Sequence, residues 1–433
     1  MEYINFIKEY HTTYNFCNLS LFIDKYLVPH INEKKQNAEV STPASLRKEM
    51  IDKIPLEFWK TPKKVFEPCS GKAGFLIDII DKFMEGLKED IEDEEERYRV
   101  IVEECLYFSD INKQNIFIAN LLLNPYNKYK LNTNEGDTLK LDIKMKWNLE
   151  GFDAVIGNPP YNDSQNNIGK KGGGDLLWNK FVEKSLNVWI KNNGLLLYVH
   201  PSGWRKPPSV KSKYNNLFDL MTKENQMIYL EIHNTNDGLK IFKCGTRYDW
   251  YLIKKDKIKY NTKIKDENNN IIEINMKEYK FLPNYNIEMI NNLISKNNEY
   301  CNIIYNASNY ESRKKYISTI KDEKYKYELI HSTPKSGIRY MYSSRNDLGH
   351  FNIPKVIFGD SGINNVIIDI NGKYGMSQHA IGINDNIENL ENIKKALESD
   401  KFKKILESCS WSNFQIDWRL FTYFKKDFWK EFM

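Results

Sequence analysis

Long apolar segments are absent from the chain. Among its 433 residues there is no run of about 18 apolar residues, the length that a membrane-spanning helix needs. The first residues, Met-Glu-Tyr-Ile-Asn-Phe, also lack the basic-then-apolar order of a secretory signal. We therefore expect a cytoplasmic protein with no membrane partner.

Cysteine and histidine are few and scattered. The six cysteines stand at positions 17, 69, 105, 244, 301 and 409, without the paired spacing of a zinc site or the clustering of a disulfide framework. The seven histidines form no ligand pair. The sequence therefore predicts reduced, structural cysteines and no bound metal.

A strong excess of one charge is lacking too. The chain has 63 Lys and Arg against 58 Asp and Glu, a net charge of +5 that is modest for a nucleic-acid-binding protein. An acidic run at 89–96 concentrates part of the negative charge, and we expect it to form a solvated helix extension. With 41% hydrophobic residues and a length that suggests about two to three domains, the chain is globular.

The most informative segment that is present covers residues 152–163. An apolar run from Phe152 to Ile156 predicts a buried parallel strand. The strand ends in a rigid sequence, Asn158, Pro159, Pro160 and Tyr161. Ligands bind at the carboxyl ends of strands in open α/β sheets. Because proline restricts the backbone here, the Pro159 carbonyl has a fixed direction beside the Asn158 oxygen.

This arrangement suits a weak amine nucleophile. The lone pair of adenine's exocyclic amine is delocalised into the ring, and two fixed acceptors that hold both N–H groups would free it. Tyr161 offers a flat face on which a heterocycle can stack. The alternative interpretation is a plain Pro-Pro turn after a strand, with Tyr161 as a core ring.

A strand, a glycine-containing loop and an apolar helix are predicted over residues 64–83. The loop contains Glu67, Pro68, Gly71 and Gly74, and the helix begins near Phe75. This order is typical of the first unit of a nucleotide-binding sheet, in which glycine lets the backbone approach a ligand. A glycine loop alone is weak evidence.

Acidic residues follow two further strand-like segments. Asp110 comes directly after 106–109 and could accept hydrogen bonds from ribose hydroxyls. Asp137 lies in a turn-like sequence with Thr138 and could hold an adenine amino group. Each acid alone is more often a helix cap or turn residue, but their order after successive strands favours a ligand site.

Together these motifs resemble those of S-adenosylmethionine-dependent DNA adenine-N6 methyltransferases of restriction–modification systems. The resemblance covers roughly residues 38–255 and is to the type with cofactor motifs first and a target-recognition region last. It implies that the cofactor-binding residues are Thr42, Pro43, Glu67, Pro68, Gly71, Phe75, Asp110, Asp137, Thr138 and Asn158. It also implies that Asn158, Pro159, Pro160 and Tyr161 are catalytic and that Tyr161 and Phe242 stack on the target base. One departure is Ala73, where the family usually has a second glycine.

The resemblance also implies the fold. We expect an α/β protein with a Rossmann-like, seven-stranded methyltransferase sheet that has helices on both faces, followed by a C-terminal α+β target-recognition domain. The expected divisions are an N-terminal helical segment at 1–37, a catalytic domain at 38–258 and a recognition domain at 259–433. Residues 255–275, rich in Lys, Asn and Asp, read as a connection or hairpin.

Double-stranded DNA is the implied partner. Lys170 and Lys171 lie in a polar, glycine-rich segment after the catalytic motif, which could close over an extruded base or be disordered. Arg339 and Arg345 belong to a polar run whose donors pair well with base edges, although an exposed loop would look the same. These four residues are our candidate DNA contacts.

The resulting hypothesis is direct in-line methyl transfer from S-adenosylmethionine to N6 of an adenine flipped out of sequence-specific duplex DNA. We expect a monomer, and the resemblance leaves open a companion restriction endonuclease that acts on the same site. Two alternatives remain: methylation of an amino group in a protein glutamine or in RNA, and a catalytically decayed DNA-binding subunit. The long C-terminal region and Thr42-Pro43 favour DNA.

Overall fold

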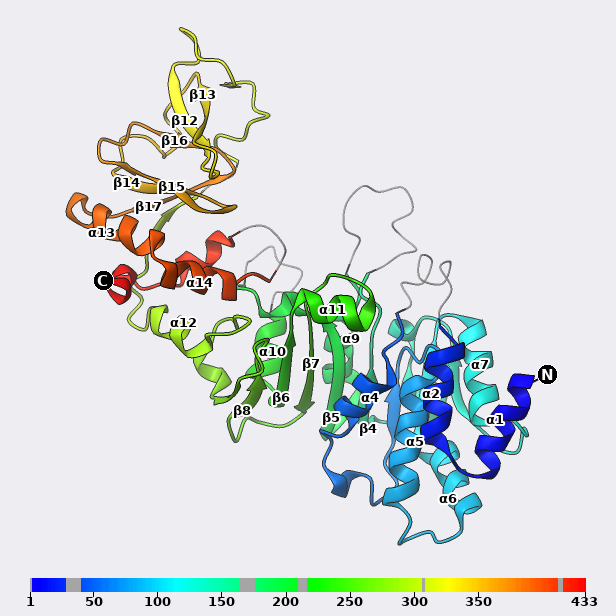
Figure 1. Ribbon diagram of the computed structural model, residues 1–433. Helices are drawn as coiled ribbons and strands as arrows, with labels where there is room; N and C mark the ends of the chain where they lie inside the picture. Colours follow the sequence, from blue (N-terminus) through cyan, green and yellow to red (C-terminus); the bar gives the residue numbers. More distant parts are fainter. Residues whose placement is uncertain (1, 29–39, 163–175, 209–215, 306–307, 412–415) are drawn as a thin grey trace. The chain divides into compact units, whose positions relative to one another are not determined.

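The computed structural model describes residues 2–28, 40–162, 176–208, 216–305, 308–411 and 416–433 (Figure 1). They form two compact units. The first contains Met1–Trp204 and Pro208–Lys280, and the second contains Arg205–Pro207 and Phe281–Met433. Within the described ranges, no helix is long and apolar enough to cross a membrane.

A mixed sheet forms the centre of the first unit. Its strand order is β3-β2-β1-β4-β5-β7-β6-β8-β9. The strands are β1 (Val65–Glu67), β2 (Leu106–Asp110), β3 (Asn132–Glu135), β4 (Phe152–Gly157), β5 (Ile190–Pro201), β6 (Gln226–His233), β7 (Tyr248–Lys254), β8 (Thr262–Lys265) and β9 (Ile271–Ile274). Strands β1 to β5 pair in parallel, and β7 is antiparallel to both β5 and β6.

The expected α/β sheet is confirmed, with an extension. The sheet has nine strands instead of the seven that the resemblance implied, because β8 and β9 add an antiparallel hairpin that pairs through β8 with β6. The hairpin comes from the segment at 255–275, for which the sequence left a connection or a hairpin open, so only the expected number of strands in the sheet is too low. The sheet therefore continues past residue 258, while the functional division of the chain into domains stays a prediction.

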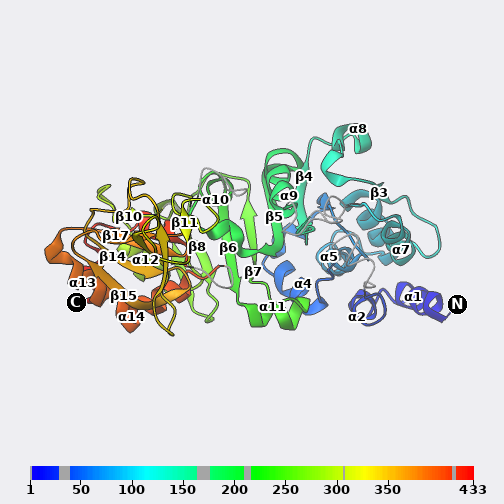
Figure 2. The same cartoon turned by 90° about the horizontal axis from the view of Figure 1, so that it is seen from above.

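Buried central strands explain why this sheet forms. Phe152, Ala154, Val155 and Ile156 of β4 are fully buried, as expected for a parallel strand with both faces covered. Burying one such large apolar side chain stabilises the fold by about 1.5–3 kcal/mol. In the view of Figure 2, helices α9 and α10 lie on one face of the sheet, and α4, α5 and α11 lie on the other.

The helices of the first unit follow the expected alternation with strands. They are α1 (Glu2–Thr12), α2 (Phe16–Tyr26), α4 (Ala44–Ile51), α5 (Gly74–Gly86), α6 (Glu94–Val100), α7 (Lys113–Leu123), α8 (Ile143–Trp147), α9 (Trp178–Lys184), α10 (Leu217–Thr222) and α11 (Thr235–Phe242). The apolar side of α2, with Phe16 and Leu19, packs into the core of this unit.

The acidic run at 89–96 does not extend the preceding helix. Helix α5 ends at Gly86, and Asp93 instead caps a new helix, α6, by accepting a hydrogen bond from the Glu96 backbone amide at 2.7 Å. Carboxylates at a helix N-terminus are stabilised by the helix dipole and by the free amides of the first turn. The run therefore begins a helix, and the predicted extension is wrong.

The second unit is α+β, as expected. One of its sheets has the order β10 (Asn302–Ile304), β17 (Ala380–Asn384), β14 (Lys355–Gly359) and β15 (Gly362–Asp369). The other has the order β11 (Ile317–Ser318), β13 (Arg339–Ser343), β12 (Tyr327–Ser332) and β16 (Gly375–Met376). Its helices include α12 (Ile287–Leu293), α13 (Ile387–Glu398) and α14 (Asp400–Ser408).

Candidate active site

One cavity of about 760 Å³ in the first unit brings the predicted site residues together. It lies where loops leave the carboxyl ends of β1, β2 and β4. The residues predicted from sequence that line it are Thr42, Pro43, Glu67, Pro68, Gly71, Phe75, Asp110, Asp137, Thr138, Asn158, Pro159, Pro160, Tyr161 and Phe242. Their proximity is a structural finding, whereas the role of each residue stays a prediction.

The Asn158 amide is held in one orientation. Its Nδ2 donates hydrogen bonds to Thr42 Oγ1 at 3.1 Å and to the Val40 carbonyl at 3.3 Å. Because a carbonyl can only accept, the NH₂ group must point toward these atoms. Asn158 Oδ1 is then left as a buried acceptor that has no partner among the described residues.

The residues after Asn158 continue the cavity wall. Pro159 is buried, and Pro160 and Tyr161 are half-buried. The Tyr161 hydroxyl is buried beside the Asn158 side chain without a hydrogen bond of good geometry among the described residues; burial raises the pKa of Tyr161, and the neighbouring Asn158 amide partly opposes this shift. Phe242, the last residue of α11, packs edge-on against Tyr248 with ring centroids 4.9 Å apart.

In the glycine loop, the second glycine stands at position 74, one residue after its usual place at position 73. Ala73 adopts the left-handed conformation with φ of 66°, which costs an alanine about 1–2 kcal/mol relative to a right-handed residue. At Gly74 a β-carbon would lie 2.8 Å from the Arg47 guanidinium. Close packing against Arg47 thus requires glycine at 74, while Ala73 tolerates a strained backbone.

Two unpaired acceptors lie at the base of this loop. Glu67 Oε2 and Ser70 Oγ are buried and have no hydrogen-bond partner within the described residues. Burial raises the pKa of the Glu67 carboxyl well above its ordinary value, and the positive charge of Arg47 only partly opposes this shift. Unpaired polar atoms are costly in a protein interior, so their presence in a cavity wall points to a polar ligand.

Asp110 connects the end of β2 to the glycine loop. Its carboxylate accepts hydrogen bonds from the backbone amides of Gly71 at 2.8 Å and Asn112 at 2.7 Å, and from Asn115 Nδ2 at 3.3 Å. Burial nevertheless raises the pKa of Asp110. The carboxylate therefore has a fixed orientation at the cavity wall.

Asp137 fulfils the cap role that the sequence left open, and it also lines the cavity. Its Oδ1 accepts from the Leu139 amide at 3.0 Å and so caps the 3₁₀ turn Thr138–Lys140. The Thr138 hydroxyl donates to the Pro68 carbonyl at 2.8 Å, which joins this turn to the glycine loop.

Arg47 is a buried residue at the site that sequence reasoning missed. Its guanidinium donates to Asp78 at 2.6 Å, to Asp24 at 2.9 Å and to Ser20 at 2.8 Å. It also donates to the Thr42 carbonyl. Helices α2, α4 and α5 are thereby joined to the segment that orients Asn158, and the residues involved are too far apart in sequence to form a recognisable pattern.

Of the four candidate DNA contacts, the structure describes only Arg339 and Arg345. Lys170 and Lys171 fall outside the described residues. Arg339 is the exposed first residue of β13, and Arg345 forms a two-point ion pair with Asp347, both contacts at 2.6 Å. Neither arginine lines the cavity of the first unit.

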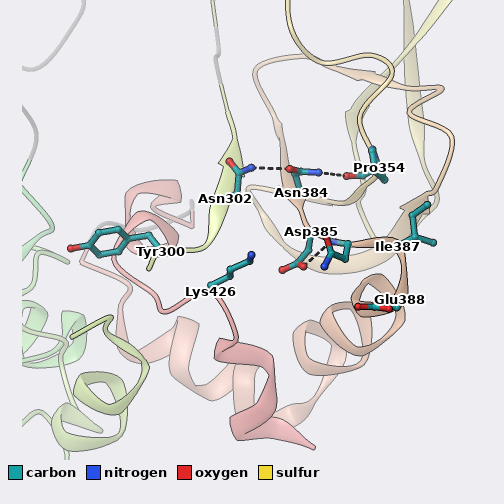
Figure 3. Close-up of a pocket in the computed structure, with 9 residues that line it drawn as sticks. Tyr300, Asn302, Pro354, Asn384, Asp385, Ile387, Glu388 and Lys426 are labelled. Atoms are coloured by element: carbon teal, nitrogen blue, oxygen red, sulfur yellow. Dashed lines mark hydrogen bonds between the residues drawn. The ribbon is translucent and has the colours of Figure 1, made fainter. Parts of the chain in front are cut away.

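A separate cavity of about 690 Å³ in the second unit contains none of the predicted site residues (Figure 3). Asn302 on its wall donates to Asn384 at 2.8 Å, and Asn384 donates to the Pro354 carbonyl at 2.7 Å. The two side-chain amides are therefore hydrogen-bonded within the cavity wall. Within the described part of the chain, no group of three His, Cys, Asp or Glu side chains is placed to hold a metal ion, and the six cysteines are unpaired.

Three of the solved structures that are similar to this chain are restriction–modification enzymes. A modification subunit of a putative type I restriction enzyme from Vibrio vulnificus YJ016 is 15% identical over 60% of this chain and 52% of that chain, with a TM-score of 0.40. The Type IIL enzyme MmeI in complex with DNA is 11% identical over 90% of this chain and 63% of its own, with a TM-score of 0.47. The DrdV chain of the DrdV–DNA complex is 12% identical over 95% of this chain and 58% of its own, with a TM-score of 0.48. The chain spans about half the length of the first of these structures (52%).

No curated protein matches the chain. Residues 11–242, in contrast, match the family described as Eco57I restriction-modification methylase. The matched segment is more than half of the 433 residues and contains every predicted site residue of the cavity. The chain therefore belongs to the Eco57I family of restriction–modification adenine-N6 methylases.

Proposed function

We propose that this protein is a site-specific, adenine-specific DNA methyltransferase that uses S-adenosylmethionine. In this proposal the methyl acceptor is the N6 amino group of an adenine flipped out of duplex DNA, and the transfer is direct and in line. Family membership implies S-adenosylmethionine-dependent DNA methylation. The observation that carries the proposal is the buried, unpaired and fixed Asn158 Oδ1 in the same cavity as the glycine loop.

The polar atoms of the cavity fit this cofactor. The unpaired Glu67 Oε2 and Ser70 Oγ suit the ammonium group of its methionine part, and the fixed Asp110 carboxylate suits ribose hydroxyls. Asp137 and Thr138 line the same cavity, and we assign them to the adenine ring of the cofactor. When bound, S-adenosylmethionine supplies a methyl group made electrophilic by the positive sulfur.

The chain's own residues act on the adenine amine. Asn158 Oδ1 and the Pro159 carbonyl accept its two hydrogens, which localises the nitrogen lone pair and makes the amine a better nucleophile. Preorganised acceptors of this kind usually supply the largest catalytic effect. Tyr161 and Phe242 stack on the ring of the extruded adenine. Flipping the base out of the duplex costs a few kcal/mol, on the order of the stacking energy of one base, and this stacking offsets that cost.

Replacing the acceptor tests the proposal. We predict that Asn158→Ala lowers the rate of methyl transfer to duplex DNA by at least about 100-fold, because one preorganised group is lost. S-adenosylmethionine binding, measured by calorimetry, should weaken far less than the transfer rate. Asn187→Ala removes an exposed amide outside the cavity and should behave like the wild type.

The assay compares duplex DNA, structured RNA and a glutamine-containing protein as methyl acceptors. Methylation of adenine N6 in duplex DNA supports the proposal. Turnover by Asn158→Ala at the wild-type rate would refute the role of this residue, and activity on RNA or protein alone would refute the substrate.

A further inference from the structure

Arg339 differs from the other described arginines of the second unit. Their guanidinium groups are engaged in the pairs Arg313–Glu311, Arg345–Asp347 and Arg419–Asp417, and in bonds from buried Arg205 to backbone carbonyls. Arg339 is exposed, and across the described ranges no hydrogen bond or ion pair involves its guanidinium. Five donors in a planar fork are therefore open to a ligand.

A strand irregularity places His331 beside this guanidinium. In the antiparallel pairing of β12 with β13, Ile330 pairs with Tyr340 and Ser332 with Arg339, so His331 is the extra residue of a bulge. Bulges redirect side chains and are common next to functional sites. His331 Nδ1 lies 2.7 Å from Ser377 Oγ, which fixes the ring.

His379 completes the group from a neighbouring loop. Its ring is 5.3 Å from that of His331 and perpendicular to it. His379 Nδ1 lies 3.1 Å from Asp360 Oδ2, so the Asp360 carboxylate already has a partner. The hydrogen bond of each ring involves Nδ1.

The electrostatics of the group agree with the geometry. Burial lowers the pKa of His331, and the nearby His379 and Arg339 lower it further. His331 is therefore neutral at physiological pH, while the guanidinium keeps its charge. The group offers one cationic fork beside a pair of imidazoles, and the fork matches a planar ligand edge with two acceptors.

We propose that Arg339, next to the pair of His331 and His379, reads a guanine in the major groove of the methylated sequence. This inference rests on the proposed function in duplex DNA. Guanine presents O6 and N7 as adjacent acceptors, and a two-point contact from arginine is the commonest specific contact to it. The recognised sequence should therefore contain at least one G·C pair besides the target adenine.

Sequencing of modified bases in DNA from cells that express the full chain defines the wild-type motif. The same experiment on Arg339→Ala should return a motif in which one guanine position has become degenerate. Arg313→Ala removes an exposed arginine paired with Glu311 and should leave the motif unchanged. Arg339→Lys, which keeps the charge but not the fork, should lose the guanine preference as Arg339→Ala does.

Binding to an altered duplex tests the same contact on wild-type protein. Replacing that guanine by 7-deazaguanine removes the N7 acceptor, and affinity should fall by roughly five- to 100-fold. Arg339→Ala should be insensitive to this replacement.

Three results would overturn the inference: an unchanged motif for Arg339→Ala, a wild-type motif without a G·C pair, or uniformly weaker binding with a smaller salt dependence. The last is the behaviour of a phosphate contact. Failure of the proposed function is distinguishable, because the wild type would then methylate no DNA.

Discussion

The carboxyl group of Glu67 is deeply buried, and one of its oxygens lacks a partner among the described residues. Burial raises its pKa, so the free protein favours the protonated form over a wider pH range than an exposed glutamate does. A positively charged ligand instead favours the carboxylate. Binding of such a ligand must therefore release a proton below the raised pKa.

We predict that affinity for S-adenosylmethionine rises with pH between about pH 5 and 7, a range above the ordinary pKa of glutamate and below that of an α-amino group. Glu67→Gln should bind more weakly and lose this pH dependence. Calorimetry in buffers of different ionisation enthalpy measures the released proton. Glu183→Gln, whose parent carboxyl also has a pKa raised by burial, lies outside the cavity and should keep the wild-type profile.

Single residues differ in how far the sequence identifies them. The lining residues from Asn158 to Tyr161 stand next to one another in a rigid motif, so their proximity follows from chain connectivity alone. Arg47 is different, because its partners Asp24 and Asp78 are far from it in sequence and only tertiary packing brings them together. The left-handed backbone conformation at Ala73 could not be predicted either, because glycine is the residue that usually adopts it.

At the scale of elements, α2, α4 and α5 are joined through Arg47 to the segment that orients Asn158. Asp24 has two roles in this connection: Oδ1 accepts from Arg47 at 2.9 Å, and Oδ2 accepts from the Ala44 amide at 2.6 Å. The latter bond fixes the start of α4, directly after Thr42 and Pro43. Asp24 is therefore a positioning residue that acts on Asn158 through Thr42.

We predict that Asp24→Ala lowers the single-turnover rate of methyl transfer by about ten- to 100-fold, because Asn158 loses part of its preorganisation. Thr42→Val acts on the same amide, so the double variant should lose less than the sum of the two effects. Asp52→Ala breaks only an ion pair with Lys82 and serves as the control.

Measurement well below the unfolding temperature separates positioning from stability. Additive effects of Asp24→Ala and Thr42→Val, or a loss confined to cofactor affinity, would contradict this prediction.

The elements themselves were predictable where a single pattern decided them. Apolar runs at β1, β2 and β4 ended in polar residues, and the α/β sheet followed from that alternation. The hairpin of β8 and β9 was not assigned to the sheet, because Lys263, Lys265 and Glu273 make its sequence look like a solvated connection. Only its pairing with β6 reveals that it extends the sheet.

At the scale of the whole molecule, two compact units have separate hydrophobic cores. The chain contributes Arg205–Pro207 to the second unit before it returns to the first at Pro208. No composition change marks this short exchange in the sequence, so it could not be predicted. Arg205 is fully buried, and its guanidinium donates to the carbonyls of Leu282 and Pro283 and to Asn284 Oδ1.

Separate cores predict two calorimetric unfolding transitions. S-adenosylmethionine should raise the midpoint temperature of only the transition that belongs to the first unit. Arg205→Ala leaves three buried acceptors without this donor, and we predict that it destabilises the second unit by about 3–5 kcal/mol. The midpoint temperature of the transition that responds to S-adenosylmethionine should not change. Arg313→Ala, which removes an exposed arginine, should change neither midpoint temperature. If Arg205→Ala instead shows a single transition whose temperature falls, the two cores unfold together. The prediction is then wrong, because a loss of stability in the second unit would also lower the unfolding temperature of the first.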